Sequence, residues 1–161
     1  MIIGLSGYAQ TGKDTIAQHL VKTYGFKRIA FADKMKVSAA ASLGISVQEL
    51  DTLKLREDVK MELYDSVSTI SISLNIREFI QRFGTEGHRN VFGPYFWVDY
   101  ALPKNFDHSN DIVIVTDVRF NEEIERIREL GGYIIKINKI KKKGHSHVSE
   151  NEILDFDFSI D

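Results

Sequence analysis

The chain has 161 residues, 43% of them hydrophobic, which suits one domain with a substantial core and leaves little room for a second. A formal charge of −2 provides no global basic field, which argues against binding to a nucleic-acid polymer. Because cysteine is absent and the apolar runs are short, the sequence predicts no disulfide, thiolate metal site or membrane span.

The first motif is a glycine-rich loop between an expected strand and an expected helix. Residues 2–5 are apolar, and Gly7 and Gly12 then bracket a loop with the spacing GxxxxGK. Backbone N–H groups in such a loop wrap a phosphate chain at the positive end of a helix, and Lys13 reaches the β- and γ-phosphates. We therefore predict a nucleoside triphosphate site. Its residues are Gly7, Ala9, Gln10, Thr11, Gly12, Lys13, Asp14 and Thr15.

Asp14 departs from the usual loop, which has a Ser or Thr that binds Mg²⁺ at this place. A hydroxyl follows at Thr15, an order similar to that of adenylate-kinase-like nucleoside monophosphate kinases. The alternative is a glycine-rich turn that binds nothing, which the agreement of motif, strand and helix disfavours. The first strand begins at the N-terminus without a signal peptide, so a cytoplasmic protein is expected.

A helix over residues 13–24, ended by Gly25, is followed by an expected strand over residues 26–32. Asp33 then lies beyond the carboxyl end of that strand, where doubly wound sheets bind their substrates. An N-cap for a helix over residues 35–43 is an equally compatible role for Asp33.

The segment up to residue 75 carries weaker signals. Ser46 and Glu49 have the spacing of a capping box, which predicts a short helix. Residues 52–65 are charged, and we predict a helix with a solvated face. Residues 66–75 alternate apolar residues with serine, which fits an extended connection or a short edge strand.

A helix over residues 76–89 is predicted by a core stripe at i, i+3, i+4 and i+7. The stripe consists of Ile76, Phe79, Ile80 and Phe83. Arg77 and Gln81 share another face, and Arg89 adds a second guanidinium. Such groups suit bidentate phosphate binding.

Surface ion pairs of these arginines with Glu78 or Glu86 are the alternative that composition alone favours. His88 is expected to be a satisfied helix histidine rather than an acid or base.

Residues 92–102 are rich in aromatic side chains and are expected to be mostly core, with one ring able to stack on a nucleobase. Residues 111–117 form a continuous apolar run that ends in Asp117, which is typical of a buried parallel strand. A carboxylate there is a candidate to hold Mg²⁺ through water. A capping or turn role is the alternative for Asp117.

In the last part of the chain, Asn121 is predicted to cap a helix that stops at Gly131 and Gly132. Residues 133–138 and 156–160 predict two further strands.

The lysine-rich stretch that begins at residue 139 is either a lid over phosphates or, as we prefer on the sequence alone, a solvated basic loop. His145 and His147 lack an accompanying cluster of carboxylates or thiolates, which argues against a metal site.

Taken in order, these motifs resemble the phage-type deoxynucleoside monophosphate kinase family of P-loop kinases. The matching segments are Gly12-Lys13-Asp14-Thr15, Phe31-Ala32-Asp33 with Lys36, Arg77 to Gln81, Phe83-Gly84-Thr85-Glu86 with Arg89, Trp97-Val98, Asp117-Val118-Arg119-Phe120 with Asn121-Glu122, Gly131-Gly132, and His147-Val148-Ser149-Glu150. The resemblance implies an α/β P-loop kinase fold, with a parallel sheet of about five strands flanked by helices on both faces. It also implies one domain over residues 1–161, with a substrate-binding helical insert around 34–102 and a lid around 139–149.

The resemblance further implies transfer of the ATP γ-phosphoryl group to the 5′-phosphate of a deoxynucleoside monophosphate, with Mg²⁺ as cofactor. The implied catalytic residues are Lys13, Asp33, Arg77 and Arg119. The implied substrate-binding residues are Asp33, Lys36, Arg77, Gln81, Glu86, Arg89 and Trp97. The implied Mg²⁺ ligands are Thr15 and Asp117. An aspartate at position 14 is normal in this family.

Two rival functions stay open. A small-molecule kinase resembling dephospho-coenzyme A kinase would phosphorylate a hydroxyl, with Asp33 as base and less need for Arg77 and Arg89. A nucleotide-binding regulatory protein without turnover would fit the missing hydroxyl at position 14. For the kinase, the expected partners are ATP and a deoxynucleoside monophosphate, with no nucleic-acid polymer and no membrane, as a monomer or a homodimer. It would act in the cytoplasm, or the host cytoplasm if phage-encoded.

Overall fold

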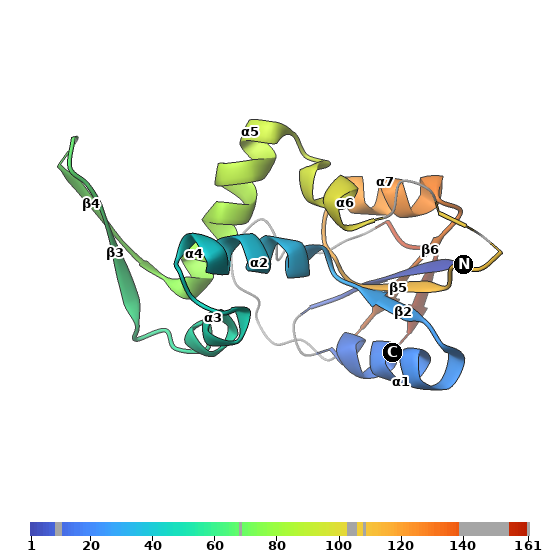
Figure 1. Cartoon of the computed structure of the whole chain (residues 1–161). Coiled ribbons are helices and arrows are strands. Elements are labelled where there is room, and N and C mark those ends of the chain that lie inside the picture. The colour runs from blue at the N-terminus through green and yellow to red at the C-terminus, as the bar shows by residue number, and fades with distance from the viewer. Residues whose placement is uncertain (9–10, 68, 103–105, 108, 139–154, 161) are drawn as a thin grey trace. The chain divides into compact units, whose positions relative to one another are not determined.

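The structure, a computed structural model, describes the chain except for residues 9–10, 68, 103–105, 108, 139–154 and 161 (Figure 1). The described residues form two compact units, Met1–Ala32 with Trp97–Asp161, and Asp33–Phe96. Whether the second unit is the predicted substrate-binding insert stays a prediction. The predicted lid at 139–149, with its two histidines, lies outside the described residues.

The first unit is built on a five-stranded parallel sheet, as the sequence predicts. Its strands are β1 (Ile2–Ser6), β2 (Lys27–Ile29), β5 (Val113–Val118), β6 (Tyr133–Ile137) and β7 (Phe158–Ile160). They lie in the order β2-β5-β1-β6-β7, and every neighbouring pair is parallel. The crossover order places the phosphate-loop strand β1 in the middle of the sheet, which fits a doubly wound α/β fold.

Helices cover both faces of this sheet. Consecutive residues of a strand point to opposite faces, and Gly4 and Leu5 of β1 face different helices. Leu5 belongs to the cluster that contains Ala17 of α1 (Lys13–Tyr24). A Cβ on Gly4 would touch Ile127 of α7 (Asn121–Glu129) at 2.8 Å, so α7 packs closely on the other face.

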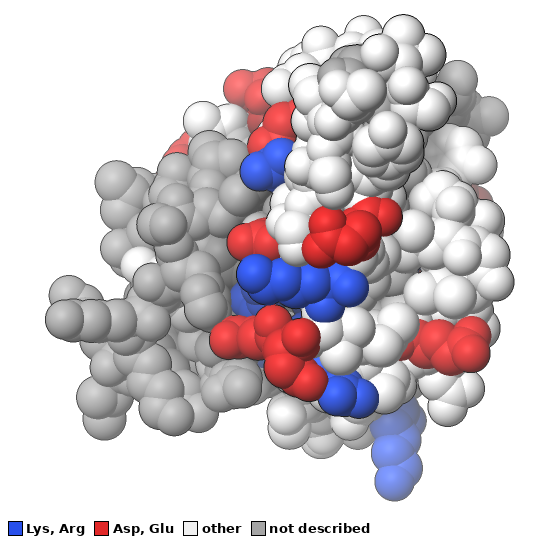
Figure 2. Space-filling view, turned by 90° about the vertical axis from the view of Figure 1, so that its left-hand side faces the viewer, with Lys and Arg blue, Asp and Glu red and all other residues white. Residues whose placement is uncertain are grey.

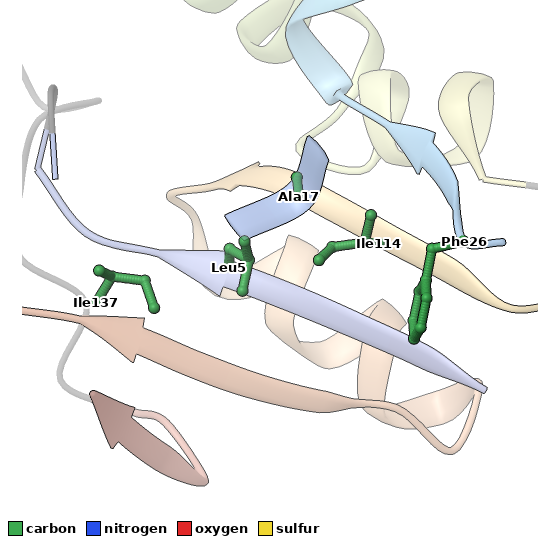
Figure 3. Packing of buried hydrophobic residues seen from close by; sticks show 5 residues of the cluster. All are labelled: Leu5, Ala17, Phe26, Ile114 and Ile137. Atoms are coloured by element: carbon green, nitrogen blue, oxygen red, sulfur yellow. The ribbon is translucent and has the colours of Figure 1, made fainter. Parts of the chain in front are cut away.

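The core of the first unit lies between the sheet and α1. Figure 3 shows five side chains that meet there from four elements and one loop, namely Leu5, Ala17, Phe26, Ile114 and Ile137. All five are at most 6% exposed. Burying a large aliphatic or aromatic side chain contributes about 1.5–3 kcal/mol, so this cluster holds α1 and the phosphate loop before it against the sheet.

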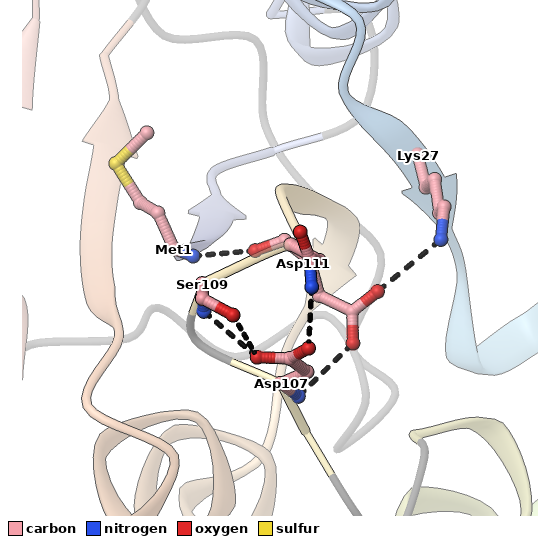
Figure 4. A network of polar contacts seen from close by, with 6 residues as sticks. Met1, Lys27, Asp107, Ser109 and Asp111 are labelled. Carbon is pink, nitrogen blue, oxygen red and sulfur yellow. Dashed lines mark hydrogen bonds and ion pairs between the residues drawn. The ribbon is translucent and has the colours of Figure 1, made fainter.

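A polar network joins the amino-terminal ends of three neighbouring strands (Figure 4). The N-terminal ammonium of Met1 donates to the Asp111 carbonyl at 2.5 Å, and Lys27 pairs with the Asp111 carboxylate at 3.2 Å. The backbone N–H of Asp107 donates to the same carboxylate at 3.1 Å. Hydrogen bonds from Ser109 and then Asn110 lower the pKa of Asp107 to about 2. These contacts lie at the opposite end of the sheet from the phosphate loop.

The second strand is shorter than predicted, and the next helix starts earlier. Residues 26–32 were expected to be extended, but β2 spans Lys27–Ile29 and α2 spans Phe31–Ser42. Asp33 therefore lies inside the first turn of α2. The alternative prediction, that Asp33 is the N-cap of this helix, is wrong. The cause is a distant carboxylate that caps Phe31 and Ala32, described below.

In the second unit, the capping box at Ser46 is confirmed and the helix predicted over residues 52–65 is wrong. Ser46 and Glu49 exchange hydrogen bonds at 3.1 and 2.8 Å at the start of α3 (Val47–Leu53). Residues Lys60–Asp65 form β3, which pairs antiparallel with β4 (Ile70–Asn75). Met61 and Leu63 lie opposite Leu74 and Ile72, so one face of the hairpin is apolar. The charges of β3 hid this period-2 pattern.

The helix predicted at 76–89 is confirmed, with a change of winding. It consists of α4 (Ile76–Gly84) and a π-helical turn (Thr85–Arg89), and α5 (Asn90–Phe92) continues it. Ile76 and Ile80 are buried with Leu50 and the alanines of α2, so the predicted core stripe is confirmed. α6 (Phe96–Ala101) follows. No helix in the described ranges is both long and apolar enough to cross a bilayer.

Gly132, where α7 returns to β6, offers a test of the packing. A Cβ there would lie 2.4 Å from Cγ2 and 2.8 Å from the carbonyl oxygen of Ile2. We expect Gly132→Ala to lower the free energy of unfolding by about 1–3 kcal/mol, because the backbone of β1 cannot move aside cheaply. Denaturant titration measures this.

Gly87→Ala is the matched control. Its Cβ would meet nothing closer than the Arg82 carbonyl oxygen at 3.6 Å, and alanine is the better helix former. We expect no loss of stability. Wild-type stability of Gly132→Ala would contradict the close approach of Gly132 to Ile2 of β1.

Candidate nucleotide site

The loop after β1 requires glycine at both motif positions, for different reasons. Gly7 has φ of 145°, and a Cβ there would stand 2.5 Å from the carbonyl oxygen of Ile137 at the end of β6. Gly12 has open space around it, but its φ of 94° is strained for any other residue. Gly12 is the N-cap of α1, so the loop ends at the positive end of that helix. This is the backbone geometry that an anion-binding loop needs.

The side chain of Lys13 forms hydrogen bonds to other residues of the loop. Its Nζ donates to the carbonyl oxygens of Gly7 at 2.7 Å and Tyr8 at 2.6 Å, and to Oγ1 of Thr11 at 3.3 Å. The Thr11 hydroxyl donates to the Tyr8 carbonyl at 2.9 Å. The ammonium group thus joins the two sides of the loop. A phosphate that enters would exchange neutral carbonyl partners for a charged one, which makes stronger hydrogen bonds.

The other predicted loop residues divide into two groups. Asp14 and Thr15 are exposed in the first turn of α1. Ala9 and Gln10 lie outside the described residues.

Asp117 near the carboxyl end of β5 is a cap for α2. Its Oδ1 accepts the N–H of Phe31 at 2.9 Å, and its Oδ2 accepts the N–H of Ala32 at 2.8 Å. The capping alternative for Asp117 is therefore confirmed. Each carboxylate oxygen has a second lone pair, so the cap is compatible with a metal-bound water, and the Mg²⁺ role stays a prediction. The described residues contain no group of three or more His, Cys, Asp or Glu side chains that could hold a metal ion.

Arg119 directly follows β5, and a hydrogen bond from its backbone N–H group holds it in place. The side chain of Arg119 is exposed, while Glu123 of α7 is only 2% exposed. One oxygen of Glu123, Oε2, accepts the N–H groups of Arg119 at 2.7 Å and Phe120 at 3.1 Å. The prediction that Asn121 caps this helix is wrong by one residue, since Phe120 occupies the cap position and its side chain has no acceptor.

Arg77 and Gln81 are half-buried and both belong to α4, where the predicted spacing of four residues places them on one face. Within the described part of the chain, Arg77 makes no ion pair, and neither Glu78 nor Glu86 pairs with an arginine. Glu78 instead accepts the N–H of Asn75 at 3.0 Å. The surface ion pairs that composition favoured are therefore not formed.

Arg89 donates to the Pro94 carbonyl at 3.0 Å, which fixes its guanidinium near the end of the π-helical turn. Such turns often occur at functional positions. His88 is confirmed as a satisfied helix histidine, with Nδ1 2.6 Å from the Phe83 carbonyl and the ring of Phe83 at 4.4 Å between centroids.

Three further predicted substrate residues have distinct surroundings. Lys36 of α2 pairs with Asp51 at 2.6 Å, and Glu86 is exposed. Trp97 is only 3% exposed and meets Tyr100 edge-to-face, so it belongs to the core. Substrate contact by these residues stays a prediction, and the small exposed area of Trp97 does not favour it.

Charge is mixed on the face drawn in Figure 2, where Lys and Arg alternate with Asp and Glu over the described residues. The mixed charge on this face gives no support for binding to a polyanionic polymer.

Sequence reasoning missed the part played by Glu123. The glutamate stands three residues after the cap position, which is half of a capping-box pattern, but phenylalanine at the cap hides it. It also missed the Thr11 hydroxyl as a support for Lys13 and the Tyr8 carbonyl.

Comparison with known proteins gives two findings. A family model described as "Deoxynucleotide monophosphate kinase" matches residues 45–155. A protein of Acanthamoeba polyphaga mimivirus, named "Putative deoxynucleotide monophosphate kinase", is 27% identical over 147 residues, covering 86% of this chain and 74% of that protein. The family match begins after the phosphate loop, so the loop is a separate observation.

The cap on α2 can be tested without reference to function. We expect Asp117→Ala to speed amide hydrogen exchange at Phe31 and Ala32 and to lower the free energy of unfolding by about 1–3 kcal/mol, since two part-buried N–H groups lose their acceptor. Asp33→Ala, in the same turn and exposed, is the control and should cost less than about 1 kcal/mol. Unchanged protection of both amides would contradict the cap.

Proposed function

The chain belongs to the deoxynucleotide monophosphate kinase family, and we propose that it transfers the γ-phosphoryl group of ATP to the 5′-phosphate of a deoxynucleoside monophosphate. The observation that carries the proposal is the loop of Gly7 to Lys13, whose geometry suits a triphosphate and which lies outside the matched range. The product is the deoxynucleoside diphosphate, an intermediate on the way to DNA synthesis.

On the donor side, the loop N–H groups and Lys13 bind the ATP phosphates. Lys13 leaves the carbonyls of Gly7 and Tyr8 and turns to the β- and γ-oxygens. The hydroxyl of Thr15 and the carboxylate of Asp117 are hard oxygen donors of the kind that suits Mg²⁺, which in kinases is held by one or two protein oxygens together with phosphates and water. Bound Mg²⁺ would neutralise charge on the transferred group.

On the acceptor side, a monophosphate is already ionised at neutral pH, so the protein needs alignment and positive charge rather than a strong base. The support comes from Arg77, a half-buried guanidinium that makes no ion pair with the described residues. Such a group suits bidentate binding of a phosphate. Lys36 is less suited, because Asp51 already neutralises it.

The remaining acceptor residues are assigned by family resemblance. They are Asp33, Gln81, Glu86 and Arg89. Arg119 is assigned in the same way as a residue that contacts the transferred phosphoryl group.

The substrate is tested by an assay of ADP release over the four common deoxynucleoside monophosphates, with ATP and Mg²⁺. We expect turnover with at least one of them and none with dephospho-coenzyme A, which offers a hydroxyl acceptor. Binding of ATP without turnover on any acceptor would instead favour a regulatory nucleotide-binding protein.

Arg77 is tested against a neighbour on the same helix. We expect Arg77→Ala to raise the KM for the monophosphate about 10- to 100-fold, the loss of a charge-assisted hydrogen-bond pair, with the KM for ATP unchanged. Arg82→Ala removes an equal charge from an exposed position of α4 and should leave both constants near wild type. Identical kinetics of the two variants would rule out Arg77 as an acceptor ligand.

A further inference from the structure

Glu123 is a buried carboxylate that does more than a helix cap requires. Burial of a charged group is costly unless hydrogen bonds compensate, and Glu123 is 2% exposed. The cap of α7 needs only the N–H of Phe120 to be satisfied. The shorter of the two bonds, at 2.7 Å, goes to the preceding residue, Arg119, which lies outside the helix.

Two other helices of the chain show what a plain cap looks like. Glu49 at the start of α3 and Glu78 at the start of α4 are exposed, and each accepts the N–H of its cap residue, at 2.8 and 3.0 Å. Among these three helix-start glutamates of the described chain, Glu123 differs in being buried and in accepting the earlier N–H as well.

The residue held in this way lies beside the phosphate loop. Val118, the last residue of β5, pairs with Ser6, the last residue of β1. The loop starts one residue after Ser6, and Arg119 comes one residue after Val118. The sheet fixes Arg119 on one side and Glu123 fixes it on the other.

We propose that Glu123 is a positioning residue, which holds the backbone of Arg119 so that the exposed guanidinium is presented at the phosphate loop. The inference rests on the proposed function, in which Arg119 stabilises the transferred phosphoryl group. Because that charge develops in the transition state, loss of the positioning should lower kcat rather than raise KM.

Two substitutions of Glu123 by side chains of similar length distinguish the effect of its hydrogen-bond acceptor from the effect of the volume it fills. Glu123→Gln keeps a carbonyl oxygen that can accept both N–H groups, since a single oxygen accepts them now. Glu123→Met fills the buried space but offers no strong acceptor. We expect near wild-type kcat for Glu123→Gln, and a fall of about tenfold or more for Glu123→Met with little change in either KM.

Glu49→Met is the matched control. It removes a carboxylate of the same kind from the start of α3 and should leave kcat unchanged. Assays are run at a temperature where circular dichroism shows every variant folded. If Glu123→Met does not fold, Glu123→Asp replaces it, because the shorter carboxylate cannot reach both N–H groups.

A double-mutant cycle with Arg119→Ala decides between positioning and general stabilisation. If Glu123 acts through Arg119, adding Glu123→Met to Arg119→Ala should change kcat by no more than about twofold. Multiplication of the two single effects would overturn the inference, as would equal losses in the Gln and Met variants. An absence of wild-type turnover on every monophosphate would instead refute the proposed function, so the two failures are distinguishable.

Discussion

The parallel pairing of β1 with β5 determines where the chemistry of the first unit can lie. Parallel strands end at the same edge of the sheet, and here Ser6 and Val118 end side by side. Beyond Ser6 the chain enters a loop that requires glycine at positions 7 and 12. Next to Val118 are Asp117 and Arg119. The predicted phosphate loop, the α2 cap and the exposed residue Arg119 therefore share one edge.

Two carboxylates at this edge hold the backbone through hydrogen bonds from N–H groups. Asp117 accepts two N–H groups at the start of α2, and Glu123 accepts two between β5 and α7. Negative charge beside the predicted phosphate site would be unfavourable in isolation. Here each carboxylate sits at the positive end of a helix, whose dipole offsets it. The result is a backbone held at the start of α2 and between β5 and α7, which suits the proposed phosphoryl transfer because a preorganised site needs little reorganisation.

Features that depend on residues close together in the sequence could be predicted, and features that depend on distant residues were missed. The loop bounded by Gly7 and Gly12, the strand over residues 111–117 and the stripe of Ile76 and Ile80 are predicted from local patterns. The stripe is found as predicted, and the strand is found with slightly different bounds, Val113–Val118. Phosphate binding by the loop stays a prediction. The start of α2 was missed because its cap is Asp117, 86 residues from Phe31. β3 was missed because the charged residues of a two-stranded hairpin conceal its alternation. The role of Glu123 was missed because a backbone N–H group carries no residue-type signal.

The contacts of Lys13 bear on whether the loop is ready for a nucleotide. Two of its three hydrogen bonds go to the carbonyl oxygens of Gly7 and Tyr8, and the third goes to Oγ1 of Thr11, whose hydroxyl also donates to the Tyr8 carbonyl. These bonds connect Lys13 with Gly7, Tyr8 and Thr11 of the predicted phosphate loop. In the proposed function, Lys13 leaves these partners for a phosphate, and the rearrangement of its side chain costs conformational entropy. The missing hydroxyl at position 14 does not alter this, because none of these bonds involves Asp14.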